Sequence, residues 1–144
     1  MAASELAAVI TLDTSGLLAL LNRKDPAHDR TRTALIAAGA PYLVPSGILG
    51  EIAYLIEQRL PMALDPFLAD LEDGSFTIDC GMDDLPRIRR LVDRYRDLPL
   101  GFADASVIAC AERSGGAVLT LDPRDFGVVA REGTIQPLPW LPGR

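Results

Sequence analysis

Short apolar runs alternate with helical patterns along almost the whole chain, and this alternation limits the possible folds more than any other feature. Runs rich in β-branched and other apolar residues are typical of strands. We expect strands over Ala8–Leu12, Tyr42–Val44, Phe76–Cys80, Val118–Leu121 and Ile135–Leu138, the last at an edge. Strands that alternate with helices favour a parallel sheet with both faces covered. The sequence predicts an α/β fold around a mostly parallel, twisted sheet of about four or five strands.

Caps and breakers mark the helices between these strands. Thr14 and Ser15 are expected to cap the first helix, Pro61 to stop the third, and Gly115 with Gly116 to close the last. We expect helices over Gly16–Asn22, Asp25–Gly39, Ser46–Leu60, Pro66–Asp73, Leu85–Arg96 and Phe102–Ser114.

The length of 144 residues suits one domain spanning 1–144, and 49% hydrophobic residues provide a core. The first residues carry Glu5 and no basic residue, unlike a secretory signal. The most apolar stretch, Ala34–Pro45, is short and interrupted by Gly39 and Pro41, whereas a membrane span needs about 20 residues. We therefore expect a cytoplasmic protein that does not cross a membrane.

Cysteine and histidine chemistry is disfavoured. The chain has two isolated cysteines, Cys80 and Cys110, and a single histidine, His28, expected at the surface or as a cap. The net charge of −6 argues against a protein that is basic throughout, as many nucleic-acid binders are. The basic residues are nevertheless clustered, which suits either local phosphate contacts or a solvated helix face: Arg23, Lys24, Arg30, Arg32, and then Arg87, Arg89, Arg90, Arg94, Arg96.

Four acidic residues lie where burial would be costly. Asp13 and Asp122 each end a predicted strand, while Glu51 and Asp104 fall in helices. At 100° per residue Asp104 lies in the middle of the apolar stripe of its helix, and Glu51 lies at the margin of its own. Each has an ordinary alternative: a helix cap or first-turn acid for the aspartates, a turn opener for Asp122 before Pro123, and a boundary residue for Glu51.

Their joint position favours a metal site instead. The carboxyl ends of parallel strands meet at one edge of the sheet, where ligands bind. Carboxylates brought together repel one another until a cation neutralises them. Oxygen ligands alone favour Mg²⁺, with Mn²⁺ as the other choice, and such ions chiefly serve phosphate chemistry. Hydroxyls of Thr14 and Ser15 are candidates to orient a carboxylate or a water molecule.

Four segments, in order, also resemble the PIN-domain ribonucleases and, among them, the VapC toxins of bacterial toxin–antitoxin pairs. Each segment alone is weakly specific, whereas the ordered set is more so and covers nearly the whole chain. The segments are Leu12–Ser15, Pro45–Glu51, Asp97–Ser106 and Leu119–Phe126.

The resemblance implies a three-layer PIN-like domain that hydrolyses RNA phosphodiester bonds with one or two Mg²⁺ ions. It would assign Asp13, Glu51, Asp104 and Asp122 to the catalytic metal site, with Thr120 supporting them by hydrogen bonding. Asp125 is close enough in sequence to share or replace the role of Asp122, and the motif leaves this open. The family also implies a homodimer silenced by a cognate antitoxin, for which Gly16–Leu21 and the helix from Ser46 are candidate apolar walls.

Other readings of the acids are weighed against this one. A haloacid-dehalogenase-type phosphatase needs an aspartate where Ser15 stands, and a receiver domain needs a lysine near its acidic pocket, whereas Lys24 lies beyond the first helix. The remaining alternatives are a PIN nuclease of RNA processing that is not a toxin, and a module that binds RNA or protein with little turnover.

Overall fold

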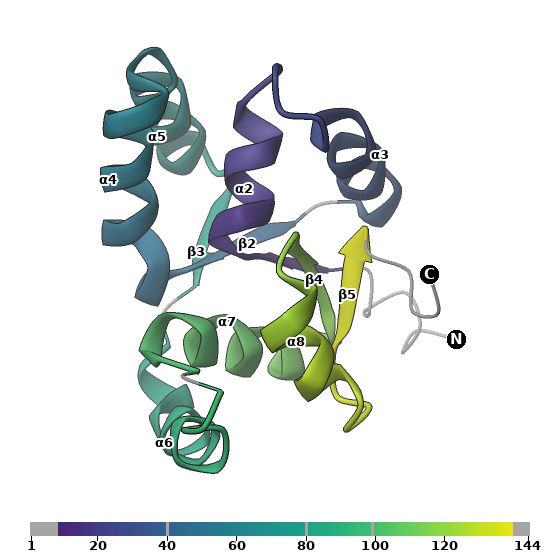
Figure 1. Ribbon diagram of the computed structural model, residues 1–144. Coiled ribbons are helices and arrows are strands. Elements are labelled where there is room, and N and C mark those ends of the chain that lie inside the picture. The colour runs from purple at the N-terminus through teal and green to yellow at the C-terminus, as the bar shows by residue number, and fades with distance from the viewer. Residues whose placement is uncertain (1–8, 40, 80, 99, 140–144) are drawn as a thin grey trace.

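Five parallel strands form a single sheet in the order β3-β2-β1-β4-β5 (Figure 1). The computed structural model describes residues 9–39, 41–79, 81–98 and 100–139. The predicted α/β class and parallel sheet are confirmed. The strands are β1 (Ile10–Leu12), β2 (Tyr42–Pro45), β3 (Thr77–Asp79), β4 (Ala117–Thr120) and β5 (Gln136–Pro139).

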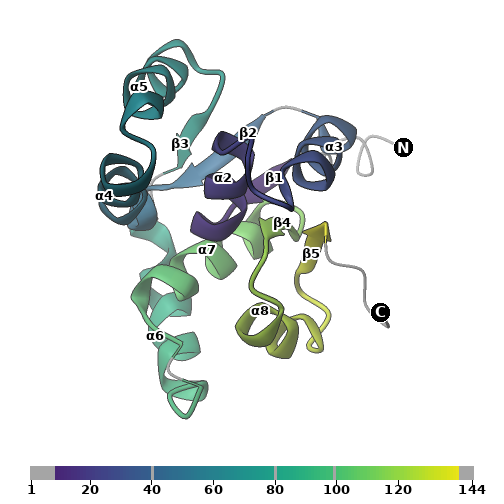
Figure 2. The ribbon, with the colours of Figure 1, turned by 45° about the horizontal axis from the view of Figure 1, so that its top comes forward.

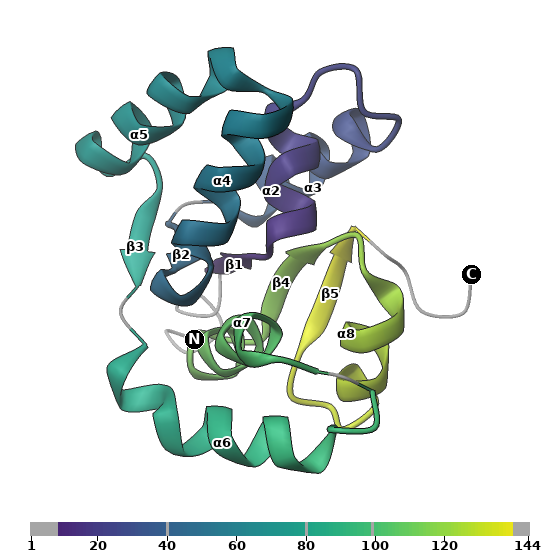
Figure 3. The same cartoon turned by 60° about the vertical axis from the view of Figure 1, so that its left-hand side comes forward.

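Helices cover both faces of this sheet, giving three layers. Figures 1 and 3 show α2 to α5 on one side of the sheet and α6 to α8 on the other. The helices are α2 (Thr14–Leu21), α3 (His28–Ala38), α4 (Leu49–Arg59), α5 (Leu64–Asp73), α6 (Leu85–Arg94), α7 (Phe102–Arg113) and α8 (Pro123–Ala130). Short 3-10 turns precede three of them: η1 (Ser46–Ile48), η2 (Pro61–Ala63) and η3 (Met82–Asp84).

The winding of the sheet reverses beside its central strand. From β1 the chain first builds outward through β2 and β3, then returns to the other side of β1 for β4 and β5 (Figure 2). In open parallel sheets the crevice at such a reversal, outside the carboxyl ends of the strands, is the usual ligand site. Asp13 directly follows β1, and Asp122 comes two residues after β4. The fold therefore places both residues at this crevice.

The core lies between the sheet and its helices and explains the apolar patterns. Ile10 and Leu12 of β1 are fully buried, because this central strand is covered on both faces. Helix α7 is buried from Ala105 to Ala111 and packs against β1, β2 and β4. A helix so enclosed holds its first turn, and Asp104 within it, in a fixed position. No helix in the described segments is both long and apolar enough to cross a membrane.

Two glycines allow helices to approach closely near the carboxyl edge. A Cβ at Gly16 would lie 2.4 Å from the carbonyl oxygen of Leu119, so only glycine lets α2 begin this close to β4. A Cβ at Gly47 would lie 2.5 Å from the hydroxyl of Ser106 in α7. These contacts hold the starts of α2 and η1 against the elements that carry the other acids.

Several predicted boundaries are wrong. The prediction that Thr14 and Ser15 cap α2 fails, because both lie inside the helix and Asp13 occupies the N-cap position. Asp25 accepts a hydrogen bond from the backbone of Ala27 in a turn, and α3 begins only at His28. Five ends fall where they are predicted, at Leu12, Tyr42, Asp73, Leu85 and Phe102. The remaining strand and helix ends shift by one to three residues, and the predicted strand ends at Ala8 and Cys80 lie outside the described residues.

Helix α8 was not predicted at all. The sequence Asp122-Pro123 favours a turn, but it also suits a helix start, with an N-cap aspartate followed by proline at the first helical position. The structure takes the second option: the Asp122 carboxylate accepts a hydrogen bond from the backbone N–H of Asp125.

Candidate active site

Asp13 is the most enclosed of the candidate acids. Its side chain lies just beyond the carboxyl end of β1, and the residue is only 5% exposed. Its Oδ2 accepts hydrogen bonds from the hydroxyls of Thr120, at 2.8 Å, and Ser15, at 2.9 Å. Burial raises the pKa of the Asp13 carboxyl, and these hydroxyls act in the opposite direction by stabilising the charged form. Asp13 is thus a buried carboxylate in a fixed orientation.

The hydroxyls that orient Asp13 are themselves held by the backbone of the strand it faces. Ser15 Oγ accepts a hydrogen bond from the N–H of Leu121, and Thr120 Oγ1 accepts one from the N–H of Asp122. The segment that follows β4 is therefore tied to the start of α2. Ser15 and Thr120 thus contact Asp13, and their supporting role at a metal site stays a prediction.

Glu51 enters the site from the first turn of α4. Thr14 Oγ1 donates a hydrogen bond of 2.6 Å to Glu51 Oε1, which joins the start of α2 to the start of α4. Glu51 is exposed, as its place at the margin of the helix predicts. A carboxylate that is oriented yet open to solvent is accessible to an ion or a substrate.

Asp104 lies in the electrostatic field of the other acids. It is half-buried in the first turn of α7. Burial, as the largest cause, and the negative charges of Asp13, Asp125, Asp122 and Glu51 together raise the pKa of its carboxyl to about 7. The structure therefore brings the four predicted acids, and Asp125, into one neighbourhood. The sequence motif left open whether Asp125 shares or replaces the role of Asp122. In the structure the charges of both residues raise the pKa of Asp104.

The donor set suits a hard divalent cation. All five acids offer carboxylate oxygens, and the repulsion that raises the pKa of Asp104 is the repulsion that a cation would relieve. As these side chains stand, no three His, Cys, Asp or Glu groups among the described residues converge on a point where one ion would fit. Side chains would have to move on binding to complete the coordination. The chemistry of the donors fits, and the ligand geometry is not preformed.

Basic side chains do not neutralise these acids. Within the described segments, no salt bridge involves any of the five. The contrast is with a second acidic group on the other side of α7, where Arg113 donates to Asp79 at 2.8 Å and to Asp84 at 2.8 and 2.9 Å. These contacts raise the pKa of the Arg113 guanidinium, and the pairing makes this second group structural.

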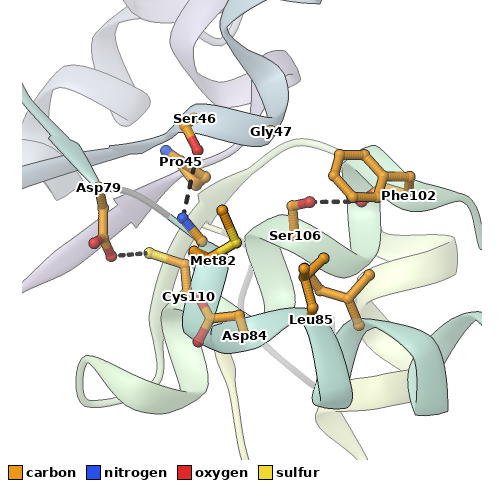
Figure 4. A pocket seen from close by; sticks show the side chains of 12 residues that line it. Pro45, Ser46, Gly47, Asp79, Met82, Asp84, Leu85, Phe102, Ser106 and Cys110 are labelled. Carbon is orange, nitrogen blue, oxygen red and sulfur yellow. Dashed lines mark hydrogen bonds between the residues drawn. The ribbon is translucent and has the colours of Figure 1, made fainter.

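A small pocket of about 210 Å³ lies beside this structural group and includes none of the five candidate acids. Figure 4 shows Cys110 donating to Asp79 and Ser106 donating to the carbonyl of Phe102 along its wall. Burial raises the pKa of the Cys110 thiol to about 12, and the bond to Asp79 contributes. The thiol stays protonated at neutral pH, which argues against thiolate chemistry there.

The single histidine has a structural position. His28 begins α3, and its Nδ1 lies 3.0 Å from the carbonyl oxygen of Ala19. It therefore joins α3 to α2, and no hydrogen bond or salt bridge within the described segments links it to the acids. Acid–base catalysis by an imidazole is not part of this site.

Comparisons with known proteins agree with the fold. The family model described as "PIN domain" matches residues 10–132. A curated relative, Ribonuclease VapC26 of Mycobacterium tuberculosis, is 28% identical over 121 residues, covering 82% of this chain and 90% of the relative.

Two solved structures are similar in shape. VapC20 of Mycobacterium tuberculosis, described as a sarcin–ricin loop cleaving toxin, gives a TM-score of 0.68 at 21% identity, covering 83% of this chain and 94% of that one. VapBC2 from Rickettsia felis, bound to a DNA fragment of its promoter, gives 0.65 at 14% identity, covering 92% and 99%. The family model spans strands β1 to β4 and every candidate acid, so the chain belongs to the PIN-domain family and is a distant relative of the VapC ribonuclease toxins.

Proposed function

We propose that this protein is a metal-dependent endoribonuclease and the toxin of a toxin–antitoxin pair. The observation that carries the proposal is a set of five carboxylates at the crevice beside β1 and β4: none forms a salt bridge within the described segments, and the charges of four of them raise the pKa of the fifth, Asp104. The 28% identity to a VapC ribonuclease supports the choice of RNA as substrate.

In this proposal, Asp13, Glu51, Asp104 and Asp122 hold the cation, and Asp125 assists. Mg²⁺ or Mn²⁺ bound there would lower the pKa of a water molecule and offset charge on the leaving oxygen of the phosphodiester. The protein's own contribution is orientation. Ser15 and Thr120 fix Asp13, Thr14 fixes Glu51, and the enclosed helix α7 fixes the backbone of Asp104.

The test is cleavage of total cellular RNA with Mg²⁺, Mn²⁺ or EDTA, beside the Asp104→Asn variant. We expect discrete fragments that need the metal and are missing with Asp104→Asn, while its circular dichroism spectrum matches that of the wild type. A synthetic sarcin–ricin loop added as a separate substrate tests whether the target named for VapC20 applies. Equal cleavage by wild type and variant, or cleavage that persists in EDTA, would refute the proposed site.

An antitoxin partner is supported by an open apolar groove. The groove encloses about 1,000 Å³ between α2, α3, η2 and α5. Ile36 and Met62 on its walls are 58% and 90% exposed, and Leu20 and Leu21 of α2 also line it. Exposed apolar side chains gathered in a groove are typical of a protein-binding surface. None of the five acids lines this groove, so it is separate from the active-site groove for which Gly16–Leu21 and the helix from Ser46 are the predicted apolar walls. Gly16–Leu21 and α4 contribute Leu20, Leu21 and Arg59 to its lining, and their role at the active site stays a prediction.

This partner is tested in cells. Expression of the wild type should arrest growth, and co-expression of the small neighbouring open reading frame should restore it. Met62→Glu should keep RNA cleavage and escape that rescue, because a charge would be buried in the contact. Harmless overexpression of an active nuclease would instead indicate an RNA-processing PIN enzyme.

A further inference from the structure

The arginines of α6 serve two different purposes. Arg87 donates two hydrogen bonds of 2.8 Å to Glu112, and Arg94 lies 3.5 Å from Glu132, so these two fasten α6 to neighbouring elements. Arg89 and Arg90 are exposed and form no salt bridge within the described segments. Packing therefore accounts for only part of this cluster.

Arg89 and Arg90, which do not fasten α6 to its neighbours, line an open groove together with Arg96. It encloses about 860 Å³ and runs along α6 to the first turn of α7. Arg89, Arg90 and Arg96 face it with a single acid, Asp93, which pairs with Arg96 on the surface. The groove is therefore positive on a chain whose net charge is −6. This charge complements a polyanion and opposes a second copy of the same surface.

An aromatic ring lies where the groove meets the start of α7. Phe102 begins α7, two residues before Asp104, and is 55% exposed despite its size. Figure 3 shows α6 running alongside α7, with the connecting segment leading to the start of α7. Unpaired bases stack on exposed aromatic rings, while arginine forks bind phosphates.

We propose that this groove binds single-stranded RNA next to the cleavage point, with Arg89 and Arg90 on phosphates and Phe102 stacked on a base. The inference rests on the proposed ribonuclease activity and adds a binding track outside the acidic site. An acidic protein needs such a local positive track to hold RNA beside five carboxylates. The occupant is single-stranded because a base inside a duplex has no free face for the ring.

The arginines are tested by binding without cleavage. Fluorescence anisotropy measures the affinity of a labelled single-stranded RNA of about 12 nucleotides in EDTA, over a series of salt concentrations. Arg89→Ala/Arg90→Ala should weaken binding and reduce the slope of log K against log salt by about 1.4, because each contact on single strands contributes about 0.7. Arg30→Ala/Arg32→Ala on α3 removes the same charge from exposed positions on the other side of the sheet and should change neither slope nor affinity by comparison.

The ring is tested by a matched pair of substitutions. Phe102→Leu keeps an apolar side chain and removes the stacking surface, and should weaken RNA binding by about five- to thirtyfold. Phe102→Tyr keeps the ring and should bind as the wild type does. Thermal melting of both variants shows whether the fold is retained, which the exposed position of Phe102 leads us to expect.

The outcomes separate the groove from the nuclease. Equal losses in the α6 and α3 double variants, or no loss in either, would overturn the RNA track even if the wild type cleaves RNA. Selective loss in Arg89→Ala/Arg90→Ala and Phe102→Leu would support it even if the wild type cleaves nothing, in which case the proposed nuclease activity alone would fail.

Discussion

Two groups of acids lie on opposite sides of α7, and they differ in what neutralises them. Asp79 and Asp84 share Arg113, which donates to both. Within the described segments, Asp13 accepts from two hydroxyls, and neither Asp13 nor Asp104 forms a salt bridge. A protein selected for stability alone would be expected to treat the two groups alike, since uncompensated buried carboxylates are costly. The difference separates a group that is paired within the structure from one whose charges are left for the ligand proposed above.

The largest expected effect comes from exchanging one aspartate in each group. Asp13→Asn should lower RNA cleavage by more than about a hundredfold, because even groups that only support a metal ligand cost roughly ten- to a hundredfold. Asp79→Asn, also at the carboxyl end of a strand, should leave the cleavage rate within about twofold when assayed below its melting temperature. Rates measured at matched folded fractions provide the check. Similar losses in both variants would erase the distinction between the groups.

Removing the guanidinium of Arg113, which Asp79 and Asp84 share, should lower stability and leave RNA cleavage unchanged. Arg113→Met leaves two neighbouring carboxylates unpaired, and Asp84 is 6% exposed. We expect the free energy of unfolding to fall by about 2 kcal/mol, less than for a fully buried pair because the Arg113 side chain is 44% exposed. Urea denaturation measures this change, and cleavage by the folded variant should persist. Arg124→Met, an exposed arginine in α8 outside any salt bridge of the described segments, is the control.

A smaller effect is expected from the hydroxyl that orients Asp13. Thr120→Val keeps the shape of a fully buried side chain and removes the bond to Asp13 Oδ2. Cleavage should fall about tenfold. Thr11→Val is the matched control, since Thr11 is equally buried in β1 and its hydroxyl meets only the sulfur of Cys110, at 3.6 Å. A control that loses as much activity as Thr120→Val would show that the loss reflects packing.

The last expected effect is a dependence of stability on pH. Without divalent cations the folded-state pKa of Asp104, about 7, lies above its ordinary value of 3.8, so the folded protein retains a proton that the unfolded chain has lost. The free energy of unfolding should therefore fall as pH rises from about 4 to about 7. The fall should be smaller in Asp104→Asn and on adding Mg²⁺. Denaturation series at several pH values give the slope, and an identical slope in the variant would contradict the assignment.

Sequence patterns predicted the repeating elements better than their ends. The parallel sheet followed from apolar runs that need only local residues, whereas α8 was missed because Asp122-Pro123 suits a turn and a helix start equally. The capping role expected for Thr14 and Ser15 was wrong because their hydroxyls bond to Glu51 and Asp13, which only the folded chain brings near.

The candidate acids could be selected from sequence, but not their environment. Position at strand ends and in an apolar stripe identified Asp13 and Asp104 without knowledge of their neighbours. Nothing local indicated that Arg113 would meet Asp84 and Asp79, which lie 29 and 34 residues earlier. Whether an acid is neutralised depends on such distant contacts. The sequence signal that could have separated the two groups of acids is Arg113, which lies at the end of the helix that also carries Asp104.

Gly16 and Gly47 have a consequence for how the results of a mutagenesis screen of this protein are interpreted. Each is excluded from bearing a side chain by an atom of another element, the carbonyl of Leu119 or the hydroxyl of Ser106, and neither supplies a functional group. In a saturation mutagenesis screen both positions should tolerate almost nothing, with the same loss of activity as the acids. Substitutions at these two positions would fail because there is no space for one methyl group. A screen for activity would therefore need a parallel measurement of folding to distinguish glycines required for packing from residues required for the reaction.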